Sequence, residues 1–195
     1  MELYTDSKAE KGMEDSILGI YKRAYNVVSA HCKLNSAAMS AMHALGYNGF
    51  KRWHRYRSSQ LHSVCLLLEN EIFDRFRIQG NFKGDDVSYS PSDMQEHLRS
   101  WDKALVEGSA ELGGLQKELF NLTGDKSSVI EKAMEILEKD FKRTGRLLKR
   151  FYESDWLALD MHTVDETIHA KYKEKEAMQW NSLTRMNCAA TLGFC

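Results

Sequence analysis

The sequence has almost no proline and no long apolar run. Pro91 is its single proline, and because proline breaks the interior of a helix, this scarcity permits long uninterrupted helices. No apolar stretch approaches the roughly 18 residues of a membrane-spanning helix, so we expect no membrane partner. The polar start of the chain lacks the apolar core of a secretory signal, and we therefore expect an intracellular, cytoplasmic protein.

The sequence also lacks an excess of charge and any close pair of cysteines. Its 27 Lys and Arg against 28 Asp and Glu give a formal charge of -1, so the chain as a whole does not attract nucleic acid. The four cysteines, Cys32, Cys65, Cys188 and Cys195, form no C-x-x-C pair, and we expect free thiols in a reducing compartment. No glycine-rich phosphate loop or dinucleotide-binding motif is present.

The clearest pattern that is present is an apolar seam. Its members recur alternately four and three positions apart: Met94, Leu98, Trp101, Leu105, Leu112, Leu115, Leu119 and Leu122. This spacing puts them on one face of a long helix that packs in a bundle. Gly108 interrupts the seam and costs about 1 kcal/mol relative to alanine. Either a neighbouring segment packs closely at Gly108, or the position once held another residue.

Helical periodicity extends over most of the remaining chain. Apolar residues at helical spacing over residues 15–45, 50–76 and 128–151 predict three more long helices. The last of these begins at Ser128, three residues before Glu131, as a capping box requires. Its expected apolar seam is Ile130, Met134, Leu137, Phe141, Thr144, Leu148 and Phe151.

We expect three regions along the chain. Residues 1–14 are predicted to form a flexible arm, residues 15–151 the helical bundle, and residues 152–195 a C-terminal helix and tail. The C-terminal helix is amphipathic over residues 155–180, and its apolar residues are expected to dock on the bundle. They are Trp156, Leu159, Val164, Ile168, Tyr172 and Met178.

The connections between the helices predict their order in space. Short turns at Gly46 and Gly124 fold the chain back, so the helices on either side run antiparallel. The longer connection after the second helix has about 14 residues and can span ~46 Å, whereas a helix of ~26 residues is ~39 Å long. The chain can therefore return along the whole bundle, with the third helix parallel to the second. The predicted fold class is all-α, a four-helix bundle with one long crossover plus a C-terminal amphipathic helix.

Short stretches of the bundle resemble ferritins. Met39–Ala41 followed by Gly46–Trp53 is similar to the end of the first ferritin helix and the start of the second, and Leu98–Leu105 with Leu119–Leu122 resembles the third. The resemblance covers roughly residues 15–151 and implies a ferritin-like bundle. It does not extend into the tail.

Ferritins oxidise Fe(II) at a di-iron centre inside the bundle, and the resemblance assigns positions to its ligands. They read Ser29, with Ser36 at a nearby tyrosine position, Leu61 and Val64 (or Ser59 and His62 in a shifted register), Gly108 or Ser109, and Asp140. Iron in such a centre needs carboxylate and imidazole ligands, which most of these side chains do not supply. The resemblance therefore implies a degenerate ferroxidase site, no cofactor bound at a di-iron centre and no enzymatic activity.

A second candidate site is the basic start of the second helix. Phe50–Arg57 interleaves aromatic residues with Lys51, Arg52, Arg55 and Arg57. Cations at a helix N-terminus oppose the helix dipole, so we expect these side chains to meet an acidic group. An Asp or Glu of this chain or of a neighbouring subunit is one alternative, and a nucleic-acid phosphate is another. The near-zero overall charge argues against nucleic acid.

These observations favour a catalytically silent ferritin-like subunit, with iron present as a stored mineral or with a role in forming a shell of ferritin-like subunits. The alternative is a structural or interaction subunit of a larger assembly, which reuses the bundle as a scaffold and binds a protein partner through its C-terminal tail. A third interpretation is an enzyme with a relocated metal site that includes His31, His43 and His62. In the first two interpretations we expect a homo-oligomer or hetero-oligomer.

Overall fold

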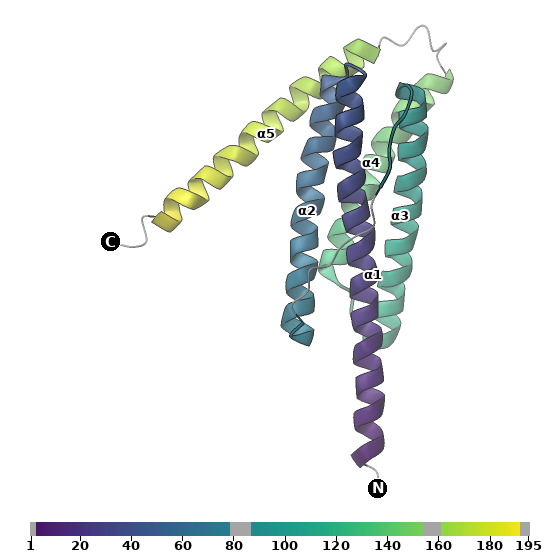
Figure 1. Cartoon of the computed structure of the whole chain (residues 1–195), viewed down its shortest axis with the longest axis vertical. Helices are drawn as coiled ribbons and strands as arrows, with labels where there is room; N and C mark the ends of the chain where they lie inside the picture. The colour runs from purple at the N-terminus through teal and green to yellow at the C-terminus, as the bar shows by residue number, and fades with distance from the viewer. Residues whose placement is uncertain (1–2, 79–86, 154–160, 192–195) are drawn as a thin grey trace.

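The computed structural model of the chain describes residues 3–78, 87–153 and 161–191. These residues form five helices and are all-α (Figure 1). The helices are α1 (Leu3–Ala44), α2 (Asn48–Phe76), α3 (Met94–Thr123), α4 (Ser128–Glu153) and α5 (Met161–Thr191). No described helix is long and apolar enough to cross a lipid bilayer.

The first four helices form a bundle in which α1 packs on α2 and α3, and α4 packs on the other sides of α3 and α2. His54, near the start of α2, hydrogen-bonds to His97, near the start of α3. The two helices therefore begin at the same end of the bundle and run parallel. Figure 1 shows α1 and α4 running in the opposite direction. The predicted all-α bundle with one long crossover and a C-terminal fifth helix is confirmed.

The apolar seam of α3 forms the centre of the core. Every predicted member from Met94 to Leu119 is buried, while Leu122 at the end of the helix is 38% exposed. Gly108 is also buried, and a Cβ atom placed on it would lie 2.1 Å from His31 Nε2. Of the two explanations for this glycine, the close approach of a neighbouring segment is therefore the one that the structure supports.

Three helix starts differ from, or refine, the predictions. The backbone is helical from Leu3, so α1 begins well before residue 15 and includes most of the segment expected to be an arm. The capping residue of α4 is Ser127 rather than Ser128, because the Ser127 hydroxyl accepts from the backbone N–H of Ile130 at 3.3 Å. At the start of α3, the Asp93 side chain accepts from the N–H of Glu96 at 2.8 Å.

Most of the predicted seam of α4 is buried or packs against the core, but Phe141 is an exception. Phe141 is 39% exposed, whereas the preceding residue, Asp140, is 1% exposed. A charged residue at a core position conflicts with a purely apolar pattern, and Asp140 is held there by partners on α2. Phe151, the last expected seam residue, lies outside the described side chains.

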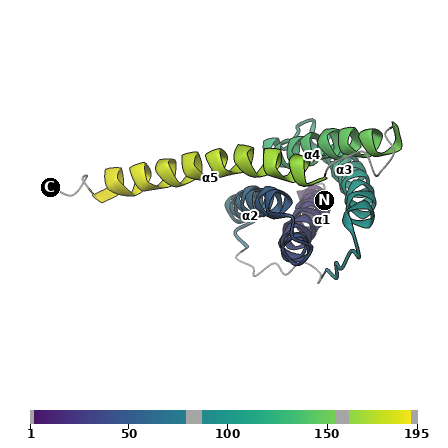
Figure 2. The ribbon, with the colours of Figure 1, turned by 90° about the horizontal axis from the view of Figure 1, so that it is seen from above.

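The fifth helix docks on the bundle with its first turns only. Val164, Ile168 and Tyr172 pack against the core, as predicted, while Met178 is 67% exposed. Trp156 and Leu159, which were also expected to dock, lie outside the described residues. Figure 2 shows that α5 crosses α2 and then extends well beyond the bundle.

Candidate functional site

The positions that the ferritin resemblance assigns to iron ligands are occupied by packing residues. Leu61 and Val64 are 1% and 0% exposed and belong to the apolar core. The Ser36 hydroxyl hydrogen-bonds to the Ser58 hydroxyl at 2.9 Å on the surface between α1 and α2. Ser29 is half-buried, and the His31 ring fills the space beside Gly108. The described residues include no group of three or more His, Cys, Asp or Glu side chains placed to hold a metal ion.

Asp140, the one acidic residue among these positions, is engaged in a buried ion pair. Arg57 Nε and Nη2 both lie 2.7 Å from Asp140 Oδ1, and Trp53 Nε1 donates to the same oxygen at 3.2 Å. Burial raises the pKa of Asp140, while the neighbouring Arg57 and Arg143 act in the opposite direction. Breaking such a pair would leave a buried charge without compensation, so Asp140 acts here as a structural residue.

Imidazole groups in the centre of the bundle form a directed chain of hydrogen bonds. Asn35 Nδ2 donates to the His31 carbonyl oxygen at 2.8 Å, which leaves Asn35 Oδ1 as the acceptor of a hydrogen bond from His54 Nδ1–H at 3.1 Å. His54 Nε2 is then left as the acceptor for His97 Nε2 at 3.2 Å. His97 Nδ1 in turn accepts from the Tyr89 hydroxyl at 2.7 Å. This series of hydrogen bonds thus connects α1, α2 and α3 and ends at Tyr89, in the segment before α3.

These hydrogen bonds require neutral imidazole rings at His54 and His97. His54 and His97 are both 0% exposed. Burial lowers the pKa of His97 to about 3 and holds the pKa of His54 well below its usual range, with His97 contributing to the shift at His54. The rings pack against each other and against Trp101, with the His54 and Trp101 centroids 4.5 Å apart. We interpret the chain as a polar core element that fixes the register of the three helices.

The basic start of α2 meets acidic groups of its own chain. Asp165 on α5 accepts from the backbone N–H groups of Gly49 and Phe50 at 2.9 Å and 2.8 Å, which caps the N-terminus of α2. Arg57 pairs with Asp140, as described above. Acidic partners within the same chain are therefore present for two parts of this stretch: Asp165 for the helix N-terminus and Asp140 for Arg57. Arg55 is exposed, and Lys51 and Arg52 are half-buried.

Gly49 is what allows α5 to sit on the start of α2. A Cβ atom at this position would lie 1.9 Å from the Asp165 backbone oxygen. A second contact lies two turns further along α5, where Arg143 of α4 donates to the Tyr172 hydroxyl. Arg143 also lies over the Trp53 ring at 5.3 Å from its centroid. The docked part of α5 is thus attached to both α2 and α4.

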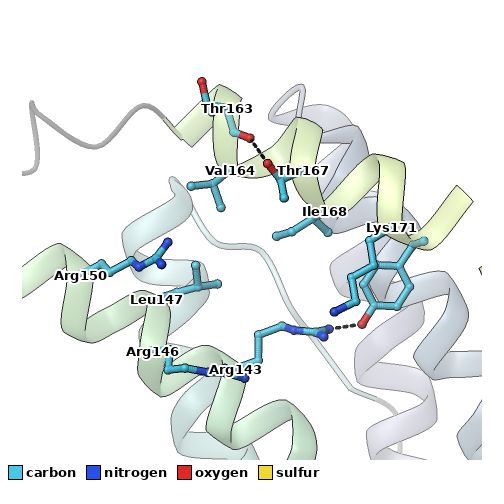
Figure 3. Close-up of a pocket in the computed structure, with 10 residues that line it drawn as sticks. Arg143, Arg146, Leu147, Arg150, Thr163, Val164, Thr167, Ile168 and Lys171 are labelled. Atoms are coloured by element: carbon cyan, nitrogen blue, oxygen red, sulfur yellow. Dashed lines mark hydrogen bonds between the residues drawn. The ribbon is translucent and has the colours of Figure 1, made fainter.

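A cleft lies between the docked part of α5 and the last turns of α4 (Figure 3). Its volume is about 380 Å³. The residues that line it are Arg143, Arg146, Leu147, Arg150, Thr163, Val164, Thr167, Ile168, Lys171 and Tyr172. Four of them are cations, and no described residue that lines the cleft is acidic.

Among the described residues, a further cation lies next to the cleft. Lys175, one turn beyond Lys171, lies 5.3 Å from the ring centroids of both Tyr56 and Tyr172. Burial lowers the pKa of Lys175, and the neighbouring Arg57, Lys171 and Arg143 lower it further. A field that makes a lysine harder to protonate also attracts an anion. Concave shape, apolar surface and convergent cations together make this cleft the candidate binding site.

Sequence reasoning missed the cleft because its residues are far apart in the chain. A local signal did exist: the segment from Phe141 to Tyr152 contains Lys142, Arg143, Arg146, Lys149 and Arg150 and no acidic residue. Its positions 143, 146 and 150 fall on one face of a helix. The contribution of Lys171 follows only from the way α5 docks.

Comparison with known proteins does not extend these observations. No protein-family model matches the sequence. No curated protein matches it either. The fold and site therefore define the class alone: an all-α bundle of four helices with a docked fifth helix and a cationic cleft at their junction.

Proposed function

We propose that the chain is a non-catalytic binding protein built on a ferritin-like bundle, and that the α4–α5 cleft takes an anionic ligand. The observation that carries this proposal is the set of four cations around a cleft that no described acidic side chain lines. A cleft of about 380 Å³ also falls in the size range of small-molecule sites, roughly 300–1,000 Å³.

The interior of the bundle supports a role without catalysis. Leu61 and Val64 supply no metal ligand, and Asp140 is paired with Arg57. The rings of His54 and His97 hydrogen-bond to each other and to Asn35 and Tyr89. The polar groups of the core are thus largely used for structure, and the cleft supplies the binding surface.

The test is binding of pyrophosphate, measured by titration calorimetry at several salt concentrations. We expect binding that weakens as salt rises, because the cations are partly solvated. The double variant Arg150→Glu/Lys171→Glu should lose binding by at least tenfold. Lys173→Glu is the matched control, since Lys173 is an exposed lysine of α5 outside the cleft. Equal binding by the double variant and the wild type would overturn the proposal.

A second candidate function is that of a catalytically silent ferritin-like subunit in a shell or larger assembly. The order of the helices and the long crossover favour it, and so does α5, which extends beyond the bundle (Figure 2). The test is the mass of the native particle with iron counted in the same fractions. A large particle that carries iron supports the storage role, and an iron-free assembly that falls apart when the chain is truncated at Asp155 supports the scaffold role. An iron-free monomer removes both.

A further inference from the structure

The apolar part of the cleft is aliphatic. Leu147 of α4 and Val164 and Ile168 of α5 face one another across it (Figure 3). The one aromatic residue of the lining, Tyr172, is 0% exposed and directs its hydroxyl to Arg143. The accessible wall is therefore suited to a flexible hydrocarbon chain more than to a flat ring, which would need an open aromatic face for stacking.

Two of the cations have no partner within the described chain. Arg143 donates to Tyr172, and Arg146 Nε donates to the Lys142 carbonyl oxygen at 3.1 Å. Arg150 and Lys171 form no hydrogen bond or ion pair with another described residue. Figure 3 shows Arg150 entering the cleft from one side and Lys171 from the other, with the aliphatic side chains between them. An anionic group at either end would thus lie next to the hydrocarbon wall.

The volume of the cleft suits a small ligand. About 380 Å³ corresponds to roughly a dozen groups of the size of a water molecule. A phosphate head with a chain of about eight carbons fits within this volume. The length of the cleft along α4, from Arg143 to Arg150, covers two helical turns, ~10 Å, which also suits one short chain.

From this arrangement we propose that the ligand is a small, soluble amphipathic anion with a single aliphatic chain, such as an alkyl phosphate. Arg150 or Lys171 binds the head at one end of the cleft, and the chain lies along Leu147, Val164 and Ile168. This inference rests on the proposed function, since it specifies the ligand of the same cleft.

The experiment is calorimetric titration of the full chain with inorganic phosphate and with butyl, hexyl and octyl phosphate, below the concentrations at which they form micelles. Each added methylene that becomes buried should tighten binding about threefold to fourfold. The gain should level off once the chain fills the cleft. Val164→Ser removes part of the aliphatic wall and should flatten this dependence on chain length. Circular dichroism confirms that the variant is folded.

The outcomes separate the two proposals. Binding of pyrophosphate and of all alkyl phosphates with equal affinity keeps the anion site but overturns the amphipathic ligand. Binding of octyl phosphate that survives in Arg150→Glu/Lys171→Glu places the chain elsewhere and overturns both. Recruitment to vesicles of anionic phospholipid, without binding of soluble octyl phosphate, overturns the soluble ligand in favour of a membrane surface.

Discussion

At the scale of single residues, the core of this bundle depends on a glycine that makes room for an imidazole ring. The expected effect of Gly108→Ala has two opposing parts. Alanine gains about 1 kcal/mol of helix propensity, but its methyl group would overlap His31, and overpacking costs about 1–3 kcal/mol. We expect a net loss of about 1 kcal/mol in the free energy of unfolding, measured by urea denaturation.

Two further variants identify the cause. Gly114→Ala, in the same helix and with no atom within 4 Å of its added Cβ, should be stabilising by up to about 1 kcal/mol. In the background of His31→Ala, Gly108→Ala should also become neutral or stabilising, because the ring that it overlaps is gone. Equal losses in both backgrounds would show that His31 is not the obstacle.

The buried histidines make stability depend on pH. Burial lowers the pKa of His31 to about 4 and of His97 to about 3, and it also lowers the pKa of His54. The unfolded chain takes up protons near pH 6.5, where the folded chain does not. The contribution of each neutral ring to the free energy of unfolding is therefore complete above about pH 6.5. It falls by about 1.4 kcal/mol per pH unit for each ring as the pH is lowered.

Urea denaturation between pH 7 and pH 5.5 measures this dependence in a range where most carboxylates stay ionised. His31→Asn should reduce the slope by up to the equivalent of one proton, because burial lowers the pKa of His31 and this ring is not part of the hydrogen bonds between His54 and His97. A wild-type stability that does not change over this range would contradict the assignment of neutral, buried rings.

At the scale of helices, the attachment of α5 depends on the carboxylate that caps α2. Asp165→Ala removes the acceptor of two backbone N–H groups. The loss of a helix cap typically costs about 1 kcal/mol of stability. Gly49→Ala should detach α5 as well, because its methyl group would collide with the α5 backbone. Both variants should raise hydrogen exchange in residues 161–175 while α3 stays protected. Glu166→Ala, next to Asp165 but exposed, serves as the control and should leave exchange unchanged.

The helices themselves could be predicted from the sequence to the extent that local periodicity determines them. The seam of α3 and the crossover follow from spacing and length, and both are confirmed. The predicted face of α4 is confirmed except at Phe141, because the charged residue next to it, Asp140, occupies a core position that its pairing with Arg57 permits. The cleft could not be predicted, since it needs the position of α5, and that position depends on contacts between distant residues, such as the Asp165 cap of α2 and the bond between Arg143 and Tyr172.

At the scale of the whole molecule, the connection between α2 and α3 must be long enough to return along the bundle. Deleting residues 79–86 leaves nine connecting residues, which span at most ~32 Å, against ~43 Å for the length of α2. Within one chain, α3 could then no longer start beside the N-terminus of α2. We expect α3 and α4 to pair with a second copy instead, which doubles the mass measured by light scattering relative to the wild type. A Gly/Ser segment of the original length should keep the wild-type mass.

The way α5 is held also gives the molecule a mechanical property. The helix is fixed near one end, around Asp165 and Tyr172, while its far end, Thr191, lies clear of the bundle in Figure 2. The part of α5 beyond Tyr172 has 19 residues and is ~28 Å long, so a tilt of about 10° around this attachment moves the tip by about 5 Å. The cleft lies beside that attachment. A ligand that tilts α5 by a small angle against α4 would therefore move the far end of the helix by several ångströms, which changes what that end can contact.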